Sequence, residues 1–246
     1  MKKIFAFIGS PGIEKSNTFT LTRMMLDRLS EMDPEISHEV FTGGQVKLEF
    51  CKGCWTCMTK GFCPADSRDD MGMLKEKMMG ADFIIFGSPV YTLTVSGQTK
   101  TFLDRLASWY HTLRLAGKPG MTVATTAHDS PEKGVHDLME MLMCGLGVQS
   151  VCRLETNGYF PGVLADPEKA QEKARRAAKE VHPYLSGEKQ VESNEDLEMA
   201  FQIVKRKSVE GRQWLPADYE YWEKNGMLGL NSYAELLEKI RSGGKV

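Results

Sequence analysis

The fold is decided by Asp82-Phe83-Ile84-Ile85-Phe86-Gly87-Ser88-Pro89-Val90-Tyr91, near the middle of a chain of 246 residues. The apolar run over residues 82–87 is typical of a central parallel strand, which is buried on both faces of its sheet. Pro89 has no backbone N–H group to donate and therefore ends the strand. The residues after it are predicted to form a loop at the carboxyl end of that strand.

Four further short β-rich runs alternate with helical patterns on either side of this strand. The predicted strands cover residues 3–8, 38–41, 82–87, 121–125 and 151–155, and the predicted helices cover residues 17–32, 69–79, 96–110, 135–144 and 167–185. This alternation predicts an α/β protein whose parallel sheet carries helices on both faces. Five such strands fit a doubly wound sheet with the strand order 2-1-3-4-5.

The alternating pattern fades near residue 185. Residues 187–196 are polar and typical of a linker, and residues 197–246 carry three short helical patterns with an aromatic group from Trp214 to Trp222. We therefore divide the chain into a domain over residues 1–185 and a helical C-terminal extension over residues 186–246. Three roles are open for the aromatic group: packing on the domain, clasping a partner subunit, or covering a cleft.

The composition argues against several classes of protein. The chain has 31 basic and 33 acidic residues, whereas a general nucleic-acid-binding protein carries a basic face. No apolar run approaches the roughly 20 residues that span a bilayer. The apolar start over residues 4–8 is shorter than the core of a signal peptide and leads into a Gly/Pro turn. We therefore expect a cytoplasmic protein with neither a membrane nor a nucleic acid as partner.

A polar loop follows the first predicted strand, with the sequence Gly9-Ser10-Pro11-Gly12-Ile13-Glu14-Lys15-Ser16-Asn17-Thr18. In an open parallel sheet, ligands bind at the carboxyl ends of the strands where the strand order reverses. Backbone N–H groups at the start of the next helix, with hydroxyl and amide side chains, form an anion site that suits a phosphate. A plain turn with a helix cap explains the same residues equally well. Glu14 stands where a Walker loop needs glycine, which disfavours a nucleoside triphosphate site.

A second loop over residues 87–98 follows the central strand at the neighbouring edge of the predicted sheet. Val90 and Tyr91 would offer an apolar wall beside a ring system. The alternative is a surface loop whose tyrosine packs partly on the core.

The unusual feature of the composition is its six cysteines, four of which lie within residues 51–63. Their spacing is Cys51-x2-Cys54-x2-Cys57-x5-Cys63. Three cysteines in succession at x2 gaps suit iron–sulfur ligation better than zinc, which commonly uses Cys-x-x-Cys pairs separated by a dozen residues or more. Free thiols or a redox-sensing disulfide stay open as alternatives. Cys144 and Cys152 lie in apolar settings, where inert core thiols are expected.

Together, the two loops resemble those of the flavodoxin-like NADPH-dependent FMN reductases. The resemblance covers roughly residues 3–165 and rests on Gly9-Ser10-Pro11 with Ser16-Asn17-Thr18, on Gly87-Ser88-Pro89-Val90-Tyr91, and on Ser96-Gly97 followed by Lys100-x-Phe102-x-Asp104-Arg105. It implies that residues 1–185 form a flavodoxin-like FMN-binding domain with a cysteine-cluster insertion over residues 50–68.

The resemblance also implies which residues hold FMN. The phosphate would be held by Ser10, Lys15, Ser16, Asn17 and Thr18. The isoalloxazine ring would face Pro89, Val90, Tyr91 and Thr92. The other side of the ring would be closed by Thr125, Thr126 and His128, at a place where the family often has glycines. No residue is assigned as a catalytic acid or base.

Within that family, the cysteine run resembles the iron–sulfur flavoproteins, which carry a [4Fe-4S] cluster beside FMN near a subunit interface. This implies a cluster held by Cys51, Cys54, Cys57 and Cys63 in a homodimer or homotetramer. The implied function is an FMN-dependent oxidoreductase that takes electrons from NAD(P)H or reduced ferredoxin and passes them to a small-molecule or protein acceptor. The alternative function is a flavin electron carrier or redox sensor with thiol or disulfide cysteines and little turnover with NAD(P)H.

Overall fold

The computed structural model describes residues 1–127 and 133–244 of the chain. The strands are β1 (Lys2–Ile8), β2 (Ile36–Thr42), β3 (Phe83–Tyr91), β4 (Thr94–Val95), β5 (Pro119–Thr126), β6 (Gln149–Phe160) and β7 (Val163–Leu164). The helices are α1 (Asn17–Met32), α2 (Thr56–Lys60), α3 (Met71–Met79), α4 (Gly97–Asp104), α5 (Ala107–Tyr110), α6 (Lys133–Gly145), α7 (Pro167–Ser186), α8 (Glu195–Glu210), α9 (Pro216–Lys224) and α10 (Tyr233–Arg241).

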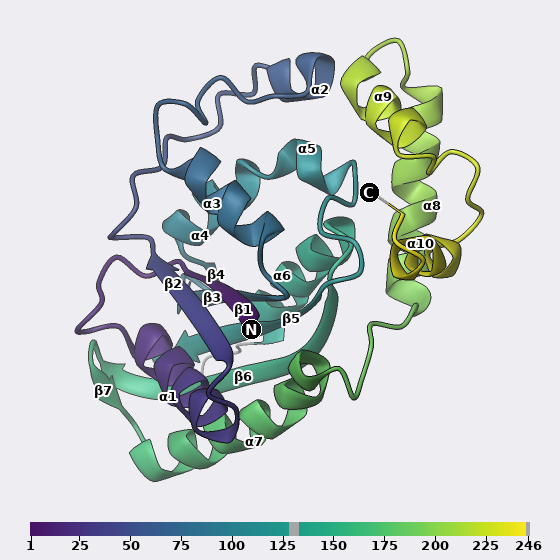
Figure 1. The fold of residues 1–246 in the computed structure, drawn as a ribbon. Helices are drawn as coiled ribbons and strands as arrows, with labels where there is room; N and C mark the ends of the chain where they lie inside the picture. Colours follow the sequence, from purple (N-terminus) through teal and green to yellow (C-terminus); the bar gives the residue numbers. More distant parts are fainter. Residues whose placement is uncertain (128–132, 245–246) are drawn as a thin grey trace.

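In the described part of the chain, five long strands form a parallel sheet in the order β2-β1-β3-β5-β6 (Figure 1). The two-residue strands β4 and β7 pair antiparallel with the ends of β3 and β6. Numbered among the parallel strands only, the order is 2-1-3-4-5. The predicted doubly wound, flavodoxin-like fold is therefore confirmed.

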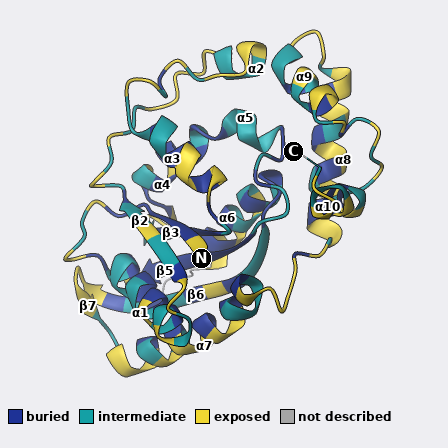
Figure 2. Ribbon diagram, in the orientation of Figure 1, coloured by how far each residue is buried: buried dark blue, intermediate teal, exposed yellow. Residues whose placement is uncertain are grey.

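The central strand β3 explains why its sequence is apolar throughout. Phe83 and Ile85 pack into the core beneath α1 and α7, whereas Ile84 and Phe86 pack into the core beneath α3, α4 and α6. Successive side chains of a strand point to opposite faces, so a strand covered on both sides needs an apolar residue at every position. Figure 2 shows buried residues gathered on β3 and β5, between the two layers of helices.

Three predicted elements differ clearly from the structure. The central strand, predicted over residues 82–87 with Pro89 ending it, continues as β3 through Pro89 to Tyr91, because β5 and β4 pair with those last residues. The helix predicted over residues 96–110 is divided into α4 and α5, with Arg105 and Leu106 between them. The last strand, predicted over residues 151–155, extends as β6 from Gln149 to Phe160 and continues into a hairpin with β7. All three differences lie close to the candidate sites described below.

The C-terminal extension packs against the domain through a third core. Trp222 and Tyr233 are fully buried there together with Leu113, which belongs to the domain. The Tyr233 hydroxyl donates a hydrogen bond to the Gly147 carbonyl oxygen at 2.5 Å, so α10 is bonded to the loop after α6. Helix α9 lies beside α2 of the cysteine region (Figure 1). Within residues 1–127 and 133–244, no helix is both long and apolar enough to cross a membrane.

Candidate functional site

A cavity of about 210 Å³ lies at the carboxyl ends of β1, β3, β5 and β6. Its lining includes most of the residues that the sequence predicted for FMN: Ser10, Lys15, Ser16, Asn17, Thr18, Pro89, Val90, Tyr91, Thr125 and Thr126. Thr92 follows Tyr91 but does not line the cavity, and His128 lies outside the described residues. Segments that are more than 100 residues apart in the sequence thus meet at one edge of the sheet.

One end of the cavity is shaped by the start of α1. Ser16 is the N-cap residue, and its Oγ accepts a hydrogen bond from the Phe19 N–H group at 3.1 Å. The other N–H groups of the first helical turn have no partner within the helix and carry partial positive charge, which favours an anion. Lys15 adds a full positive charge beside them. This end of the cavity therefore has the chemistry that a phosphate requires.

The floor of the cavity is held by a pair of threonines. Thr18 Oγ1 lies 2.5 Å from Thr125 Oγ1, and both side chains are buried. This hydrogen bond joins the first turn of α1 to the end of β5. The first loop and the third predicted contact region are thus fixed relative to each other before any ligand binds.

The second loop is tied to the first loop by a buried serine. Ser96 is the N-cap of α4, with its Oγ accepting from the Thr99 N–H group at 3.1 Å, and the same hydroxyl donates to the Gly9 carbonyl oxygen. A Cβ atom on Gly9 would lie 1.8 Å from Thr99 Oγ1, so glycine is required for this close approach. The start of α4 therefore sets the distance between the two loops that line the cavity.

The tight turn between β3 and β4 contains an unfavourable backbone conformation. Thr92 and Leu93 connect the paired residues Tyr91 and Thr94, and their φ angles are 51° and 65°. A two-residue hairpin turn with two positive φ angles normally contains Asn-Gly, and a β-branched threonine is rare there. The turn leaves Tyr91 at the cavity wall with its side chain half exposed. Strain of this kind is typical of binding loops.

A third wall was not predicted from the sequence, and it comes from the hairpin of β6 and β7. Gly158, Tyr159, Phe160 and Pro161 line the cavity opposite the second loop. The Asn17 side-chain Nδ2 donates to the Phe160 carbonyl oxygen at 2.9 Å, which ties the hairpin to α1. A Cβ atom on Gly158 would lie 2.0 Å from this Nδ2 atom, so the contact requires glycine. The Pro161-Gly162 turn after two aromatic residues was the available sequence signal.

The cavity fits FMN in its polarity as well as its position. One end offers the helix N-terminus and Lys15, and the other offers the apolar and aromatic surfaces of Val90, Tyr91 and Phe160. Asn17 Oδ1 is buried and has no hydrogen-bond partner among the described residues, so it can accept from a ligand hydroxyl. A bound FMN would supply hydride and electron transfer, while these residues hold its phosphate, orient its ring and limit access of water to it.

The cysteine segment, residues 50–68, crosses the surface between β2 and α3. Its four thiols are free; those of Cys51 and Cys54 are exposed and those of Cys57 and Cys63 are partly buried. Burial raises the pKa of Cys57, and negative charge on Cys63 and Cys51 raises it further. Hydrogen bonds from Thr56 lower the pKa of Cys54.

Four cysteine thiols are the donor set that an iron–sulfur cluster requires. The described residues contain no group of three or more Cys, His, Asp or Glu side chains already arranged for a single metal ion. The two remaining cysteines lie elsewhere. Burial raises the pKa of Cys144 to about 11 and that of Cys152 further, as expected for inert thiols, although Cys144 is only partly buried.

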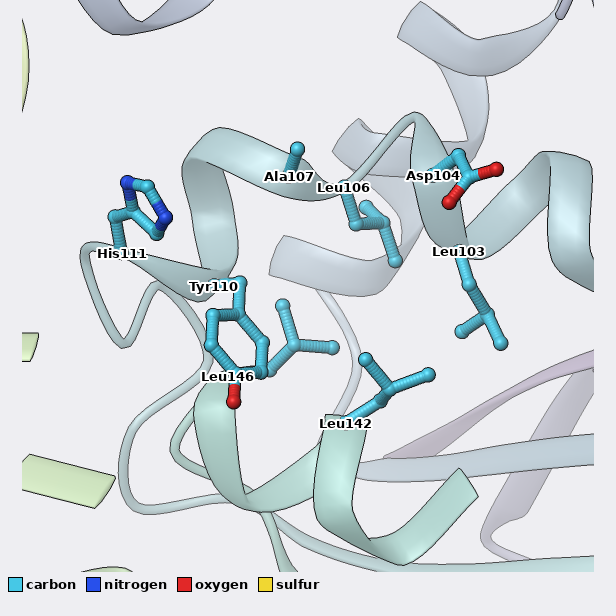
Figure 3. Close-up of a pocket in the computed structure, with 8 residues that line it drawn as sticks. All are labelled: Leu103, Asp104, Leu106, Ala107, Tyr110, His111, Leu142 and Leu146. Carbon is cyan, nitrogen blue, oxygen red and sulfur yellow. The ribbon is translucent and has the colours of Figure 1, made fainter. Parts of the chain in front are cut away.

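A second cavity, of about 220 Å³, lies between α4, α5 and α6 (Figure 3). Its lining is mainly apolar, with side chains such as Leu103, Leu142 and Leu146. The His111 Nδ1 atom at its edge is 2.8 Å from Asp218 Oδ2 of α9, so this imidazole serves to attach the extension. Unlike the first cavity, this one has no lysine among the described residues that line it.

A doubly wound sheet of this strand order, with a helix N-terminus and an aromatic wall at its carboxyl edge, is typical of flavodoxin-like proteins. Residues 2–156 match the family of NADPH-dependent FMN reductases, and the chain belongs to this family. It is therefore a flavin-dependent oxidoreductase of a family whose electron donor is NAD(P)H.

Relatives of known type agree with this assignment. The chain is 32% identical to an iron–sulfur flavoprotein of Archaeoglobus fulgidus over 182 residues, which cover 74% of this chain and 81% of the relative. It is 37% identical to an iron–sulfur flavoprotein of Methanocaldococcus jannaschii over 125 residues, covering 51% and 62%. The solved structure of an NADH:FMN oxidoreductase in its apo form has the same fold, with a TM-score of 0.56 and 18% identity over 80% of this chain and 94% of that one.

Proposed function

We propose that this chain binds one FMN in the cavity at the carboxyl edge of the sheet and passes electrons from NAD(P)H or reduced ferredoxin, through the flavin, to a small-molecule or protein acceptor. The convergence of the two predicted loops and the end of β5 on that cavity carries the proposal. In this arrangement Ser10, Lys15 and the start of α1 hold the phosphate. Pro89, Val90 and Tyr91 flank the ring, with Thr92 in the adjacent turn, and Thr125 and Thr126 close its other side.

We further propose that Cys51, Cys54, Cys57 and Cys63 hold one [4Fe-4S] cluster. The proposal is supported by four free thiols on one surface segment and by the relatives, which are iron–sulfur flavoproteins. The aromatic rings of Trp55 and Phe62 are exposed beside these thiols. An exposed aromatic surface of this kind is typical of an interface, so we expect a homodimer or homotetramer in which a second copy covers the segment.

A second candidate function is a flavin electron carrier or redox sensor whose cysteines act as thiols. The exposed Cys54, with its lowered pKa, favours this alternative, because accessible thiolates react readily with oxidants. The two functions differ in steady-state kinetics. Rapid and repeated oxidation of NAD(P)H supports the oxidoreductase, whereas slow turnover with stoichiometric electron exchange supports the carrier.

The deciding experiment is the analysis of flavin, iron and sulfide in one anaerobically purified sample. We expect one FMN per chain and about four iron and four sulfide per FMN, as in a [4Fe-4S] centre. Cys51→Ala and Cys63→Ala should each lose iron, whereas Cys144→Ala, outside the segment, should retain it. A protein that binds no added FMN contradicts the main proposal. A protein that binds FMN and holds no iron contradicts the cluster.

A further inference from the structure

The two ends of the cysteine segment lie side by side. Glu49 precedes the segment and Asp69 follows it, and the Glu49 N–H group donates to Asp69 Oδ2 at 2.8 Å. The Lys47 N–H group donates in the same way to Asp70 Oδ2 at 2.7 Å. Between these ends, the helix α2 has no buried residue. The position of the thiols therefore depends strongly on how the ends are held.

Arg105 binds both ends at once from a buried position. Its Nη1 atom donates to the Glu49 carbonyl oxygen at 2.9 Å and to Asp69 Oδ2 at 2.5 Å. Its Nη2 atom donates to Asp66 Oδ1 at 2.7 Å and to Asp69 Oδ1 at 3.3 Å. The side chains of Arg105 and Asp69 are 1% and 0% exposed. A planar guanidinium group can make this forked set of bonds, whereas a lysine ammonium group cannot.

Arg105 also connects the cysteine segment to the flavin cavity, because it stands at the end of α4. The same helix begins at Ser96, whose hydroxyl donates to the Gly9 carbonyl oxygen in the first loop. This helix has eight residues and is about 12 Å long. Its first end is bonded to the loop at Gly9 through Ser96, and its last end is bonded to the cysteine segment through Arg105.

We infer that Arg105 is a positioning residue, which holds both ends of the cysteine segment on the end of α4 and so fixes the four thiols relative to the flavin cavity. The inference rests on the proposed cluster, and it assigns a function to a residue that touches neither the flavin cavity nor the sulfur ligation directly. The positive charge of Arg105 also acts on Cys63, and its Nε atom has no hydrogen-bond partner among the described residues. A buried cation next to a cluster favours the reduced, more negative state.

The first test uses the metal-free protein, so that it does not depend on the cluster. Hydrogen exchange of residues 47–70 is compared between the wild type, Arg105→Met and Arg105→Lys. We expect much faster exchange in Arg105→Met, an intermediate rate in Arg105→Lys, and unchanged exchange around Ser16 and Thr125. Arg153→Met is the matched control, because Arg153 makes similar bonds to Asp137 and Glu140 far from the segment.

The second test reconstitutes each protein anaerobically with iron and sulfide. Arg105→Met should hold several-fold less iron per FMN than the wild type at equal FMN content, and its residual cluster should have a more negative reduction potential. Arg105→Lys should restore part of both properties, and Arg153→Met should match the wild type. Arg105→Met leaves the Asp69 carboxylate buried and unpaired, which can prevent folding. In that case the double variant Arg105→Met/Asp69→Asn, which removes this charge, is used instead of the single variant.

The outcomes separate the two proposals. Full iron content, an unchanged potential and unchanged exchange in Arg105→Met would overturn the inference. A wild type that takes up no iron would contradict the proposed cluster. Hydrogen exchange in the metal-free proteins would then decide by itself whether Arg105 holds the segment.

Discussion

Replacement of Trp222 by alanine tests how the C-terminal extension is attached to the flavin-binding domain. The Trp222 side chain is fully buried, and its ring centre lies 5.3 Å from that of Phe201 in α8. Its Nε1–H group donates to the His111 carbonyl oxygen of the domain at 2.9 Å. The preceding turn of α9 adds the bond between Asp218 and the His111 side chain. Trp222 therefore anchors α9 to the domain at His111.

The expected loss of stability follows from burial. Aromatic side chains bury about 150–250 Å² each, and this corresponds to roughly 4–6 kcal/mol at about 25 cal/mol per Å². Measured tryptophan-to-alanine changes in cores cost about 3–5 kcal/mol. We expect about 4 kcal/mol for Trp222→Ala. For Trp222→Phe we expect about 1–2 kcal/mol, because the ring is retained and the hydrogen bond to His111 is lost.

The assay combines denaturant unfolding with hydrogen exchange. Exchange should rise in α8–α10, and also in α2, which contacts α9. The strands β1 and β3, in cores separate from the extension, should stay protected. Trp214→Ala is the matched control, because Trp214 is 69% exposed and should cost less than about 0.5 kcal/mol. Equal stability losses for Trp222→Ala and Trp214→Ala would refute the assignment of Trp222 as the anchor.

Three further predictions concern the domain itself. Burial lowers the pKa of His136 below 6.5 although Glu155 Oε2 lies 3.7 Å away. Its contribution to the free energy of unfolding is therefore present above pH 6.5 and is lost as the pH falls towards the lowered pKa. In His136→Gln, the denaturant midpoint of unfolding should change less between about pH 7.5 and 5 than it does in the wild type. Ser16→Ala removes the N-cap and a hydroxyl from the phosphate end, so a fluorescence titration should show FMN affinity reduced several-fold, with about 1 kcal/mol lost in stability. Thr92→Gly removes the side chain at a φ of 51° and should raise stability by about 1 kcal/mol in thermal unfolding.

Local sequence patterns were sufficient to predict the order of the strands in the sheet and two of the segments that line the cavity. The helix over Asn17–Met32 begins after a serine cap and carries its apolar residues on one face, so its boundaries follow from the sequence. Pro89 does not end the central strand, because β3 continues to Tyr91 and Pro89 pairs with Thr125 of β5. The polar residues before Asn17, by contrast, mark a loop that lines the cavity. The α1 boundaries and this loop depend only on neighbours in the sequence.

The remaining features depend on contacts between distant residues. Arg105 divides the predicted helix over residues 96–110 at the point where it binds Asp66 and Asp69, more than 35 residues away. The Gly158 contact with Asn17 requires β6 to continue beyond residue 155, which apolar alternation alone did not indicate. Periodicity within one segment cannot show such partners, because each becomes apparent only when the sheet has brought the segments together.

The position of the extension gives a physical reason for its presence. The cysteine segment has little regular structure of its own. Its helix α2 has five residues, and Gly53, Trp55 and Gly61 near it have positive φ angles. A helix of this length is unstable without tertiary contacts. Arg105 holds the ends of the segment, whereas Cys57 lies within α2 and Cys54 lies two residues before it. Helix α9 is the element that supports α2 there: a Cβ atom on Gly61 would lie 3.6 Å from the Ala217 Cβ atom. The contact with α9 therefore gives α2 a support that the proposed cluster would need if its four ligands are to keep a fixed arrangement.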